Sequence, residues 1–453
     1  MIYIIRPKPS RLLSAYIPSL GISLLSAALK KEHLPVTFID TTFEPDFLSI
    51  IESNGFPKVI MLSLYIDNSK NGIEIIDQIK NVYQQITVMV GGPHITLLGK
   101  KAFNLSQNIN YICIGDCIPQ VVQVVKDIYH QTYKNTRGIV RSENNFSYPN
   151  IMPDFSIFNS NKYFQIFPIE FANGCLQKCP YCNEHVLKQF FIRSLSDVIS
   201  EIKYVCENYA AKYFRFVDSS LTNLGNDFEC LLNLIIENNL NIHWSGYTNI
   251  EKIRPVFVPI LKKSGCIALY FGIETLSPKV TSGKNHAKNL DHIRSIIDLL
   301  KKYDISTHCN FIIGLPGETK STIEETLRNI LEIAPDSVNA GIFYLTPNST
   351  FHNHLEQYDI KIIDKDWIEK QHITYHDPNY NYYQTNTLTQ PEMRKLLSKF
   401  KEVIEGTPNI CWNMSDFAIL AFLSIGGNVN QLKYLWKSAE KKMVHNYSII
   451  LQS

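Results

Sequence analysis

The sequence has little net charge and no long run of basic residues. Its 44 Lys and Arg residues nearly balance 42 Asp and Glu residues, which leaves a formal net charge of +2. Proteins that bind nucleic acid or anionic membranes through surface charge carry a basic patch or stripe. We therefore expect no nucleic acid partner.

The sequence also lacks an apolar run long enough to cross a membrane. The apolar run Phe417 to Ile425 falls far short of the about 20 residues that a spanning helix needs. Residues Met1 to Leu29 are largely apolar, but Arg6, Lys8 and Arg11 interrupt them and no small-residue cleavage site follows. We expect a soluble, cytoplasmic protein without a membrane span.

Several common catalytic and nucleotide-binding motifs are missing. The sequence contains no G-x-S-x-G and no H-E-x-x-H, so serine hydrolases and zinc proteases of those types are not supported. It contains no G-x-G-x-x-G and no Walker lysine, which argues against a dinucleotide or nucleoside triphosphate site. Ten cysteines are scattered through a long chain without a secretory signal, so a disulfide scaffold is not indicated either.

The first part of the chain alternates between strand and helix. Its helical segments, such as Ser19 to Lys31 and Gly72 to Val82, carry apolar residues on one face. This alternation predicts an α/β domain over residues 1–132 with a doubly wound parallel sheet, Rossmann-like, whose ligands bind at the carboxyl ends of the strands. Five runs are strand-like: Ile2–Arg6, Val36–Asp40, Val59–Leu64, Val88–Gly91 and Tyr111–Gly115.

A second alternation follows a polar stretch. Residues 133–162 lack helical periodicity and are expected to be a linker. Residues 163–352 contain six strand–helix units with longer helices, among them two with expected capping boxes at Ser194 and Ser321, and predict a partial (β/α)6 barrel. Residues 353–453 are expected to form a mainly helical region, in which the aromatic segment Tyr375 to Tyr383 could line a substrate entrance.

Three of the cysteines form a C-x3-C-x2-C pattern directly after the first strand of the expected barrel. Cys175, Cys179 and Cys182 lie in a segment that Gly174 and Pro180 keep out of helix and strand, so a loop can fold the three thiolates around one centre. The other seven mostly sit in apolar patterns, where cysteine behaves as a small hydrophobe: Cys113, Cys117, Cys206, Cys230, Cys266, Cys309 and Cys411.

Two other metal centres compete with an open iron–sulfur cluster. Structural zinc could use the three cysteines and His185, although the C-x2-H step is tight and His185 begins a helical turn. A ferredoxin-type cluster needs four cysteines, and Cys206 belongs to the next helix. Three ligands on a four-iron cluster leave one iron open, and this is the interpretation that the pattern favours.

The cysteine pattern resembles the signature of the radical S-adenosylmethionine superfamily. Further motifs of that family follow in order at strand ends: Phe216–Ser220, where the second acid of the usual pair is Ser, Phe271–Thr275, Asn310–Thr319 with Gly-Leu-Pro-Gly-Glu-Thr, and Leu345–Thr350. The resemblance covers Phe164 to about Thr350. It implies a 4Fe-4S cluster on Cys175, Cys179 and Cys182, whose open iron binds S-adenosylmethionine and cleaves it to a 5′-deoxyadenosyl radical.

The resemblance also implies residues that bind S-adenosylmethionine. Glu274 would contact the methionine ammonium and Asn310 the ribose hydroxyls, unless these two side chains only support loop turns. The remaining implied residues come from the same strand ends: Tyr181, Asp218, Ile312 and Gly314.

The front domain resembles the cobalamin-binding domain that is fused to many radical enzymes of this superfamily. The Gly-Gly-Pro-His turn at Gly91 to His94 matches that family closely, whereas the D-x-H-x-x-G motif, which supplies a histidine ligand to cobalt, is absent. Many radical relatives lack that motif too. We expect His94 to close the turn by hydrogen bonding rather than to bind cobalt. The cobalamin-binding residues that the resemblance implies are Ser63, Leu64, Tyr65, Gly91, Gly92, His94, Gly115 and Asp116.

The leading hypothesis is therefore a cobalamin-dependent radical S-adenosylmethionine methyltransferase that acts on an unactivated carbon of a metabolite or peptide. An enzyme of the same architecture that cyclises, rearranges or oxidises its substrate is the alternative, and a non-catalytic cobalamin or iron–sulfur sensor is a third. The radical chemistry implies an external electron donor such as flavodoxin or ferredoxin. The sequence does not identify the substrate.

Overall fold

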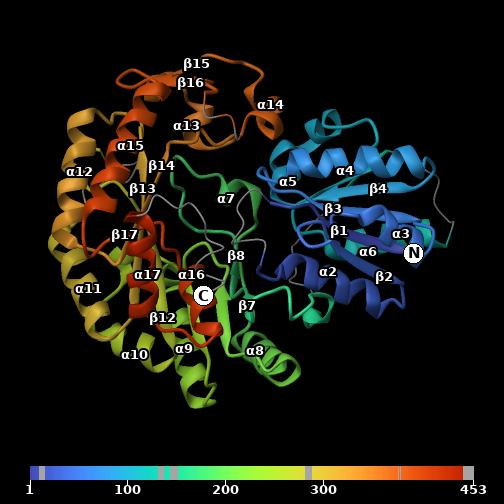
Figure 1. The fold of residues 1–453 in the computed structure, drawn as a ribbon, viewed down its shortest axis with the longest axis horizontal. Helices are drawn as coiled ribbons and strands as arrows, with labels where there is room; N and C mark the ends of the chain where they lie inside the picture. Colours follow the sequence, from blue (N-terminus) through green and yellow to red (C-terminus); the bar gives the residue numbers. More distant parts are fainter. Residues whose placement is uncertain are drawn as a thin grey trace. The chain divides into compact units, whose positions relative to one another are not determined.

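The computed structural model describes residues 1–9, 16–130, 137–142, 151–280, 288–375, 377 and 379–441 (Figure 1). The chain divides into two compact units. Unit 1 contains Met1–Phe164 and Lys365–Tyr380, and unit 2 contains Gln165–Asp364 and Asn381–Ser453. The expected cobalamin-binding-like domain and the expected barrel thus belong to different units.

Unit 1 is built on a six-stranded parallel sheet in the order β2-β1-β3-β4-β5-β6. The strand order reverses between β1 and β3, and open α/β sheets bind ligands at the carboxyl ends of the strands next to such a reversal. The doubly wound parallel sheet expected from the sequence is confirmed. The strands are β1 (Ile2–Arg6), β2 (Val36–Asp40), β3 (Val59–Ser63), β4 (Thr87–Gly91), β5 (Tyr111–Ile114) and β6 (Gly138–Arg141).

Strand β6 corrects the expected linker over residues 133–162. Gly138–Arg141 pairs in parallel with β5 and extends the sheet. The strand is short and lies at the sheet edge, where only one neighbour is available, so it carries a weak sequence pattern. Residues 131–136 and 143–150 lie outside the described residues.

Helices cover both faces of the unit 1 sheet (Figure 1). Apolar residues of α3, α4 and α5 share one core with the strands, whereas α2 and α6 pack together on the other face. Ile368 of α14 also packs against the core of unit 1, although it lies far along the chain. The helices are α2 (Leu20–Lys31), α3 (Phe47–Asn54), α4 (Ser69–Val82), α5 (Pro93–Leu98), α6 (Ile118–Tyr129) and α14 (Trp367–Thr374), with 3-10 turns η1 (Gly99–Asn104) and η2 (Phe155–Ile157).

Unit 2 contains a seven-stranded parallel sheet in the order β17-β14-β13-β12-β11-β10-β7. Six of its strands are those of the expected partial barrel, and β17 adds a seventh in parallel to β14. The strands are β7 (Ile166–Ile169), β10 (Tyr213–Phe216), β11 (His243–Thr248), β12 (Cys266–Glu274), β13 (Ser306–Ile313), β14 (Ser337–Ile342) and β17 (Cys411–Trp412). Two short antiparallel ribbons pair β8 (Ala172–Asn173) with β9 (Phe191–Ile192) and β15 (Ile360–Ile362) with β16 (Tyr383–Thr385).

Helices such as α9 and α15 pack on the outer face of this sheet, whereas α16 contacts its inner face. Trp244 of β11, for example, packs edge-on against Phe228 of α9, and Phe311 of β13 lies near Phe400 of α15. The helices are α7 (Glu184–Leu187), α8 (Leu195–Tyr209), α9 (Asn226–Glu237), α10 (Val258–Lys263), α11 (Leu290–Lys302), α12 (Lys320–Ile333), α13 (Thr350–Asn353), α15 (Gln390–Gly406), α16 (Asp416–Ser424) and α17 (Val429–Lys441), with 3-10 turns η3 (Leu221–Leu224), η4 (Ile250–Lys252), η5 (Pro255–Phe257) and η6 (Glu356–Tyr358).

One expected helix start is right and one is wrong. The Ser194 hydroxyl accepts a hydrogen bond from the Asp197 backbone N–H and caps α8 as expected. The N-cap of α12 lies two residues before the expected one, because Thr319 and Thr322 form the capping box instead of Ser321 and Glu324. The Thr319 hydroxyl accepts from the Thr322 N–H, and the Thr322 hydroxyl accepts from the Thr319 N–H.

The region 353–453 is not one helical appendage. Residues 365–380 join unit 1, while 381–441 return to unit 2 and supply β16, β17 and three helices. Tyr382 and Tyr383, at the end of the aromatic segment, are buried in unit 2 rather than lining an open entrance. Among the described helices, none is both long enough and apolar enough to cross a membrane.

Candidate functional site

The three motif cysteines lie on a loop between the strands of a small ribbon. Strands β8 and β9 pair antiparallel on either side of residues 174–190 and bring the two ends of this loop together. Gly174 has a φ of +73°, and a Cβ at this position would lie 3.2 Å from the Gln189 carbonyl oxygen. Glycine is therefore needed for the chain to turn directly into Cys175.

All three thiols are half-buried, and the loop backbone supports two of them. The backbone N–H of Gln177 donates to Cys175 Sγ and that of Glu184 donates to Cys182 Sγ, each at 3.4 Å. Such bonds favour a thiolate, which is the ligand form, whereas burial raises the pKa of Cys182 to about 11 in the metal-free chain. Within the described ranges, no three His, Cys, Asp or Glu side chains converge on a single metal ion.

Asp218 anchors the start of the cysteine loop. It follows strand β10, and its carboxylate accepts hydrogen bonds from the backbone N–H groups of Phe171 (3.1 Å) and Ala172 (2.6 Å). Burial raises the Asp218 pKa to about 6, and these two donors oppose that rise. Because its oxygens accept hydrogen bonds from the protein backbone, Asp218 positions the start of the loop. It is not free to bind a ligand in this structure.

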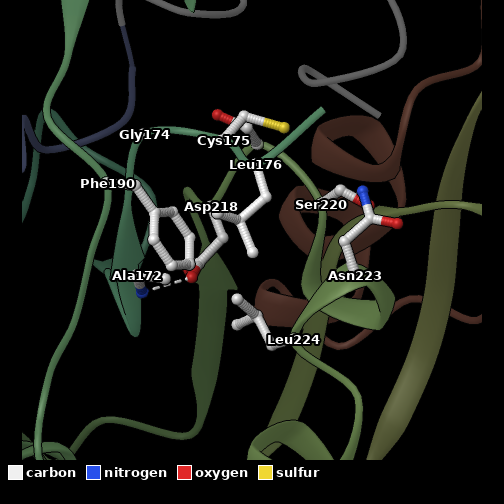
Figure 2. Close-up of a pocket in the computed structure, with 10 residues that line it drawn as sticks. Ala172, Gly174, Cys175, Leu176, Phe190, Asp218, Ser220, Asn223 and Leu224 are labelled. Carbon is white, nitrogen blue, oxygen red and sulfur yellow. Dashed lines mark hydrogen bonds between the residues drawn. The ribbon is translucent and has the colours of Figure 1, made fainter. Parts of the chain in front are cut away.

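A small pocket lies behind the cysteine loop. Figure 2 shows Phe190, Leu176 and Leu224 around it, with Asp218 hydrogen-bonded to Ala172 at one side. The apolar side chains around the pocket pack beneath the cysteine loop. The pocket is therefore part of the structure that holds this loop in place.

Glu274 and Tyr181 meet at the carboxyl end of the barrel sheet. The Tyr181 hydroxyl donates to Glu274 Oε1 at 3.1 Å, which joins the cysteine loop to the end of β12. Glu274 has a φ of +67° at a shift in the β12–β13 register. A non-glycine residue in this region is strained, and such strain is found preferentially at functional sites. Glu274 is thus held in place by its backbone and by Tyr181.

Strand β13 ends in a turn, residues 314–318, which we call the glycine loop and in which Gly314, Leu315 and Glu318 are buried. Gly314 has a φ of +91°, and its N–H donates to Glu318 Oε2 at 2.7 Å. Burial raises the Glu318 pKa to about 7, opposed by the N–H groups of Gly314 and Leu315. Met393 of α15 packs so closely that its Sδ would lie 2.5 Å from a Cβ on Gly314. A helix from the C-terminal region therefore fixes the glycine loop.

The two remaining residues of unit 2 that the resemblance assigns to S-adenosylmethionine binding lie on strand β13. Asn310 and Ile312 of β13 are half-buried on the inward face, and Asn310 Oδ1 accepts a hydrogen bond from Asn339 Nδ2 at 3.2 Å. Since all strands of the sheet are parallel, their carboxyl ends share one edge. The structure thus brings the cysteine loop, Glu274, Asn310 and the glycine loop to one edge of unit 2.

The opposite, lower part of the barrel interior is closed by a buried polar layer, which we call the barrel floor. Arg215 Nε donates to Asp416 Oδ2 at 3.0 Å, and Ser245 Oγ donates to the same oxygen at 2.8 Å. The His308 ring stacks on Tyr270 at 4.4 Å, and burial lowers its pKa to about 4. Asp416 is the first residue of α16, so the C-terminal region completes the floor.

The implied cobalamin-binding residues gather at the carboxyl edge of the unit 1 sheet. Ser63, Gly91 and Gly115 follow or end adjacent strands β3, β4 and β5. Gly92 has a φ of +100°, and a Cβ there would lie 2.7 Å from the Leu64 carbonyl oxygen. Tyr65, Gly115 and Asp116 are exposed, whereas Leu64 is fully buried and can offer only its backbone.

His94 closes its turn through the backbone and not through its ring. Its N–H donates to the Leu64 carbonyl at 3.2 Å, while neither ring nitrogen has a hydrogen-bond partner among the described residues. Burial, and then the nearby His372, lower its pKa to about 4. With only 2% of its surface exposed, His94 is placed as a packing residue and not as a cobalt ligand.

Sequence reasoning missed the polar interior of the barrel. Arg215 and Asp416 stand in apolar segments, and Ser337, Asn339 and Gly341 alternate along β14. Two signals in the sequence could have indicated this interior. One is a charged residue within an apolar strand, and the other is an alternation of polar residues in a strand expected to be buried on both faces.

Two family models match this chain. The model of the radical SAM superfamily matches residues 169–330, and that of the B12 binding domain matches residues 13–117. These ranges correspond to unit 2 and unit 1, respectively.

Relatives and solved structures agree with these matches. An uncharacterised methyltransferase of Pyrococcus horikoshii is 24% identical over 69% of this chain and 72% of its own length. Bacteriochlorophyllide d C-12(1)-methyltransferase of Chlorobaculum tepidum is 24% identical over 78% of this chain and 76% of its own length. The structure of TsrM from Kitasatospora setae, a radical S-adenosylmethionine methyltransferase solved with cobalamin and a 4Fe-4S cluster, superposes with a TM-score of 0.73 at 14% identity, covering 98% of this chain and 99% of TsrM.

Proposed function

Because this chain is a radical SAM superfamily enzyme that carries a B12 binding domain, we propose that it is a cobalamin-dependent methyltransferase acting on an unactivated carbon. The observation that carries the proposal is the shared edge in unit 2. The cysteine loop, Glu274 at the end of β12, and Asn310 and the glycine loop of β13 meet where parallel sheets bind ligands. The second support is the open edge of the unit 1 sheet.

The cysteine loop suits an iron–sulfur cluster. It offers three thiols and backbone N–H groups directed at two of the sulfurs, and such hydrogen bonds tune cluster potentials. Cys175, Cys179 and Cys182 would hold three irons of a 4Fe-4S cluster and leave the fourth for S-adenosylmethionine. Bound together, these groups supply one-electron chemistry, and bound cobalamin supplies a methyl group to transfer.

The protein's own residues would position S-adenosylmethionine. The Glu274 carboxylate, fixed by Tyr181, is suited to hold the methionine ammonium. Asn310 would bind the ribose hydroxyls, while the backbone of Tyr181, Ile312 and Gly314 would border the adenine. Asp218 would contribute indirectly, because it holds the start of the cysteine loop.

The unit 1 edge suits a large planar cofactor. Gly91 and Gly92 let the turn pack closely on Cys113 and Leu64, and the exposed Tyr65, Gly115 and Asp116 leave the edge accessible. Because His94 is buried in its turn, we propose that it supports the site through packing and does not bind cobalt. We further propose a small-molecule or peptide substrate and an external one-electron donor of the flavodoxin or ferredoxin type.

Bound cobalamin is the measurement that tests the proposal. The protein would be reconstituted with iron and sulfide without oxygen, incubated with hydroxocobalamin, gel-filtered and examined by absorbance. The matched control is the Cys175→Ala, Cys179→Ala, Cys182→Ala triple variant. We expect near-stoichiometric corrin on both proteins and an iron–sulfur band on the wild type alone.

A wild type that holds the cluster but retains no corrin would refute methyl transfer and leave a radical enzyme that cyclises, rearranges or oxidises its substrate. Product analysis gives an independent check. Methyl transfer by the proposed route releases both S-adenosylhomocysteine and 5′-deoxyadenosine, whereas a non-methylating radical enzyme releases only the second.

A further inference from the structure

Strand β7 leaves the barrel sheet shortly before the cysteine loop. Its pairing with β10 ends at Ile169, whose carbonyl accepts a hydrogen bond from the Val217 N–H at 2.9 Å. Residues 170–172 follow, and only two residues then separate them from Cys175. Because so short a stretch joins the sheet to the first cysteine, the path of residues 170–172 determines where the cysteine loop begins.

Two residues from outside this stretch hold its backbone. Asp218 accepts hydrogen bonds from the N–H groups of Phe171 and Ala172, as described above. Arg193, which directly follows β9, binds the carbonyl groups. Its backbone N–H donates to the Phe171 carbonyl at 3.0 Å, and its Nη1 donates to the Glu170 carbonyl at 2.7 Å. Asp218 and Arg193 therefore satisfy four consecutive backbone groups at the point where the chain turns into the cysteine loop.

Glu201 of α8 orients the Arg193 side chain. Arg193 Nη2 donates to Glu201 Oε2 at 2.5 Å, and the two side chains are only 6% and 1% exposed. The guanidinium group is a rigid, planar fork of donors. With one arm on the Glu201 carboxylate, its other arm has a fixed direction towards the Glu170 carbonyl.

Stability alone does not account for this buried ion pair. Replacement of a buried pair by apolar residues of similar volume is often neutral or stabilising, because two charges must lose their water when they are buried. An apolar pair could not, however, donate a hydrogen bond to the Glu170 carbonyl. The property that the pair of Arg193 and Glu201 adds is thus a directed contact with the chain that enters the cysteine loop.

We propose that Arg193, oriented by Glu201, is a positioning residue for the iron–sulfur cluster. With Asp218 it sets the direction of the chain into the loop, and so the place of Cys175 relative to the other two thiols. Figure 2 shows Asp218 and Cys175 around the same small pocket. Arg193 acts through the backbone of residues 170–172 and not as a ligand. This assignment rests on the proposed function, because it requires the cluster.

Replacement of Arg193 by Lys tests the directed contact. Lys keeps the positive charge opposite Glu201 but lacks the planar fork. Wild type and variant would be reconstituted without oxygen and reduced, and iron release to ferrozine would be followed by absorbance. Residues that orient metal ligands contribute strongly to metal retention, so we expect Arg193→Lys to release iron about tenfold faster. The electron paramagnetic resonance spectrum of the reduced cluster should also differ from that of the wild type.

Arg215→Lys is the matched control. Arg215 forms a second buried ion pair in unit 2, with Asp416, and the side chains of that pair are 7% and 1% exposed. The same substitution there also alters a buried guanidinium but leaves residues 170–172 untouched. We expect Arg215→Lys to release iron at the wild-type rate and to give the wild-type spectrum. Melting temperature shows that each variant is folded.

A second variant keeps the test decisive if Arg193→Lys does not fold. The double variant Arg193→Met, Glu201→Leu removes both charges together, and it should show the same faster release and altered spectrum in a folded protein. If neither variant folds, the pair serves the stability of unit 2 and the inference is overturned. A folded Arg193 variant in which either iron release or the spectrum is unchanged also overturns it, as does equal acceleration in Arg215→Lys.

The outcomes separate this inference from the proposed function. A wild type that takes up no cluster refutes the radical chemistry and the inference together. A wild type that holds both cofactors while Arg193→Lys behaves like it overturns the inference alone. Faster iron release from Arg193→Lys in a protein that retains no corrin supports the positioning role and refutes methyl transfer.

Discussion

The ion pair in the barrel floor gives the sharpest prediction for stability. Replacement of Asp416 by Ala would leave the Arg215 guanidinium buried without its counter-ion, at 6% exposure. Breaking a buried pair in this way costs about 3–5 kcal/mol. The Ser245 hydroxyl would also lose its acceptor, at a further cost of about 1 kcal/mol. Domains are stable by only about 5–15 kcal/mol, so we expect a large decrease in the free energy of unfolding.

The double variant Arg215→Met, Asp416→Leu tests the physical reason for this loss. Because it removes both charges and leaves apolar side chains in their place, it should recover most of the stability that Asp416→Ala loses. Equilibrium urea unfolding, followed by tryptophan fluorescence, gives the comparison, since Trp412 and Trp436 lie in the same C-terminal region. A loss below about 1 kcal/mol in Asp416→Ala, or a double variant as unstable as the single one, would refute the argument.

Three further predictions concern the proposed cofactor sites. Burial raises the Glu318 pKa from 4.5 to about 7, so the folded state keeps a proton that the unfolded state loses, and wild-type stability should fall as pH rises through this window. Glu318→Gln should lack that fall, and denaturant midpoints of the two proteins from pH 5.5 to 7.5 test it; parallel curves would contradict it. Gly92→Ala should cost about 1–3 kcal/mol and lower corrin retention, because its φ is +100° and a carbonyl blocks the Cβ. Gly99→Ala, with φ +55° and open space, is the control, and equal corrin retention in both would count against the site. Met393→Ala should weaken S-adenosylmethionine binding about tenfold in calorimetry by loosening the glycine loop, a loss of about 1.4 kcal/mol, with iron and corrin content unchanged; Phe400→Leu on the same helix should not.

The order of strands and motifs could be predicted because parallel α/β units leave strong local patterns. Each of the first five strands of unit 1 lies within a residue of its expected range, and the cysteines follow the first barrel strand as expected. The motifs at Glu274 and Gly314 fall at strand ends, and a parallel sheet then brings such ends together regardless of the residues between them.

Contacts between distant segments could not be predicted in this way. No local pattern shows that Asp416 pairs with Arg215 or that Met393 packs on Gly314, because these contacts depend on where α15 and α16 return to the sheet. The role of Asp218 could not be predicted for a similar reason. Its position after β10 suggested a ligand group, but only the three-dimensional structure shows that the backbone of Ala172 occupies its oxygens.

The barrel floor also has a consequence for how the protein is made. Arg215 and Asp416 are separated by 201 residues, and translation proceeds at about 5–20 residues per second. The guanidinium therefore leaves the ribosome about 10 to 40 s before its counter-ion exists. Until β17 and α16 are made, the unit 2 sheet would hold an unpaired charge and an uncovered β14 edge, so the nascent barrel stays open to water and to chaperones. Iron and sulfide would then reach the cysteine loop either before closure or after release of the chain, and pulse-labelling of the cluster during synthesis can tell which.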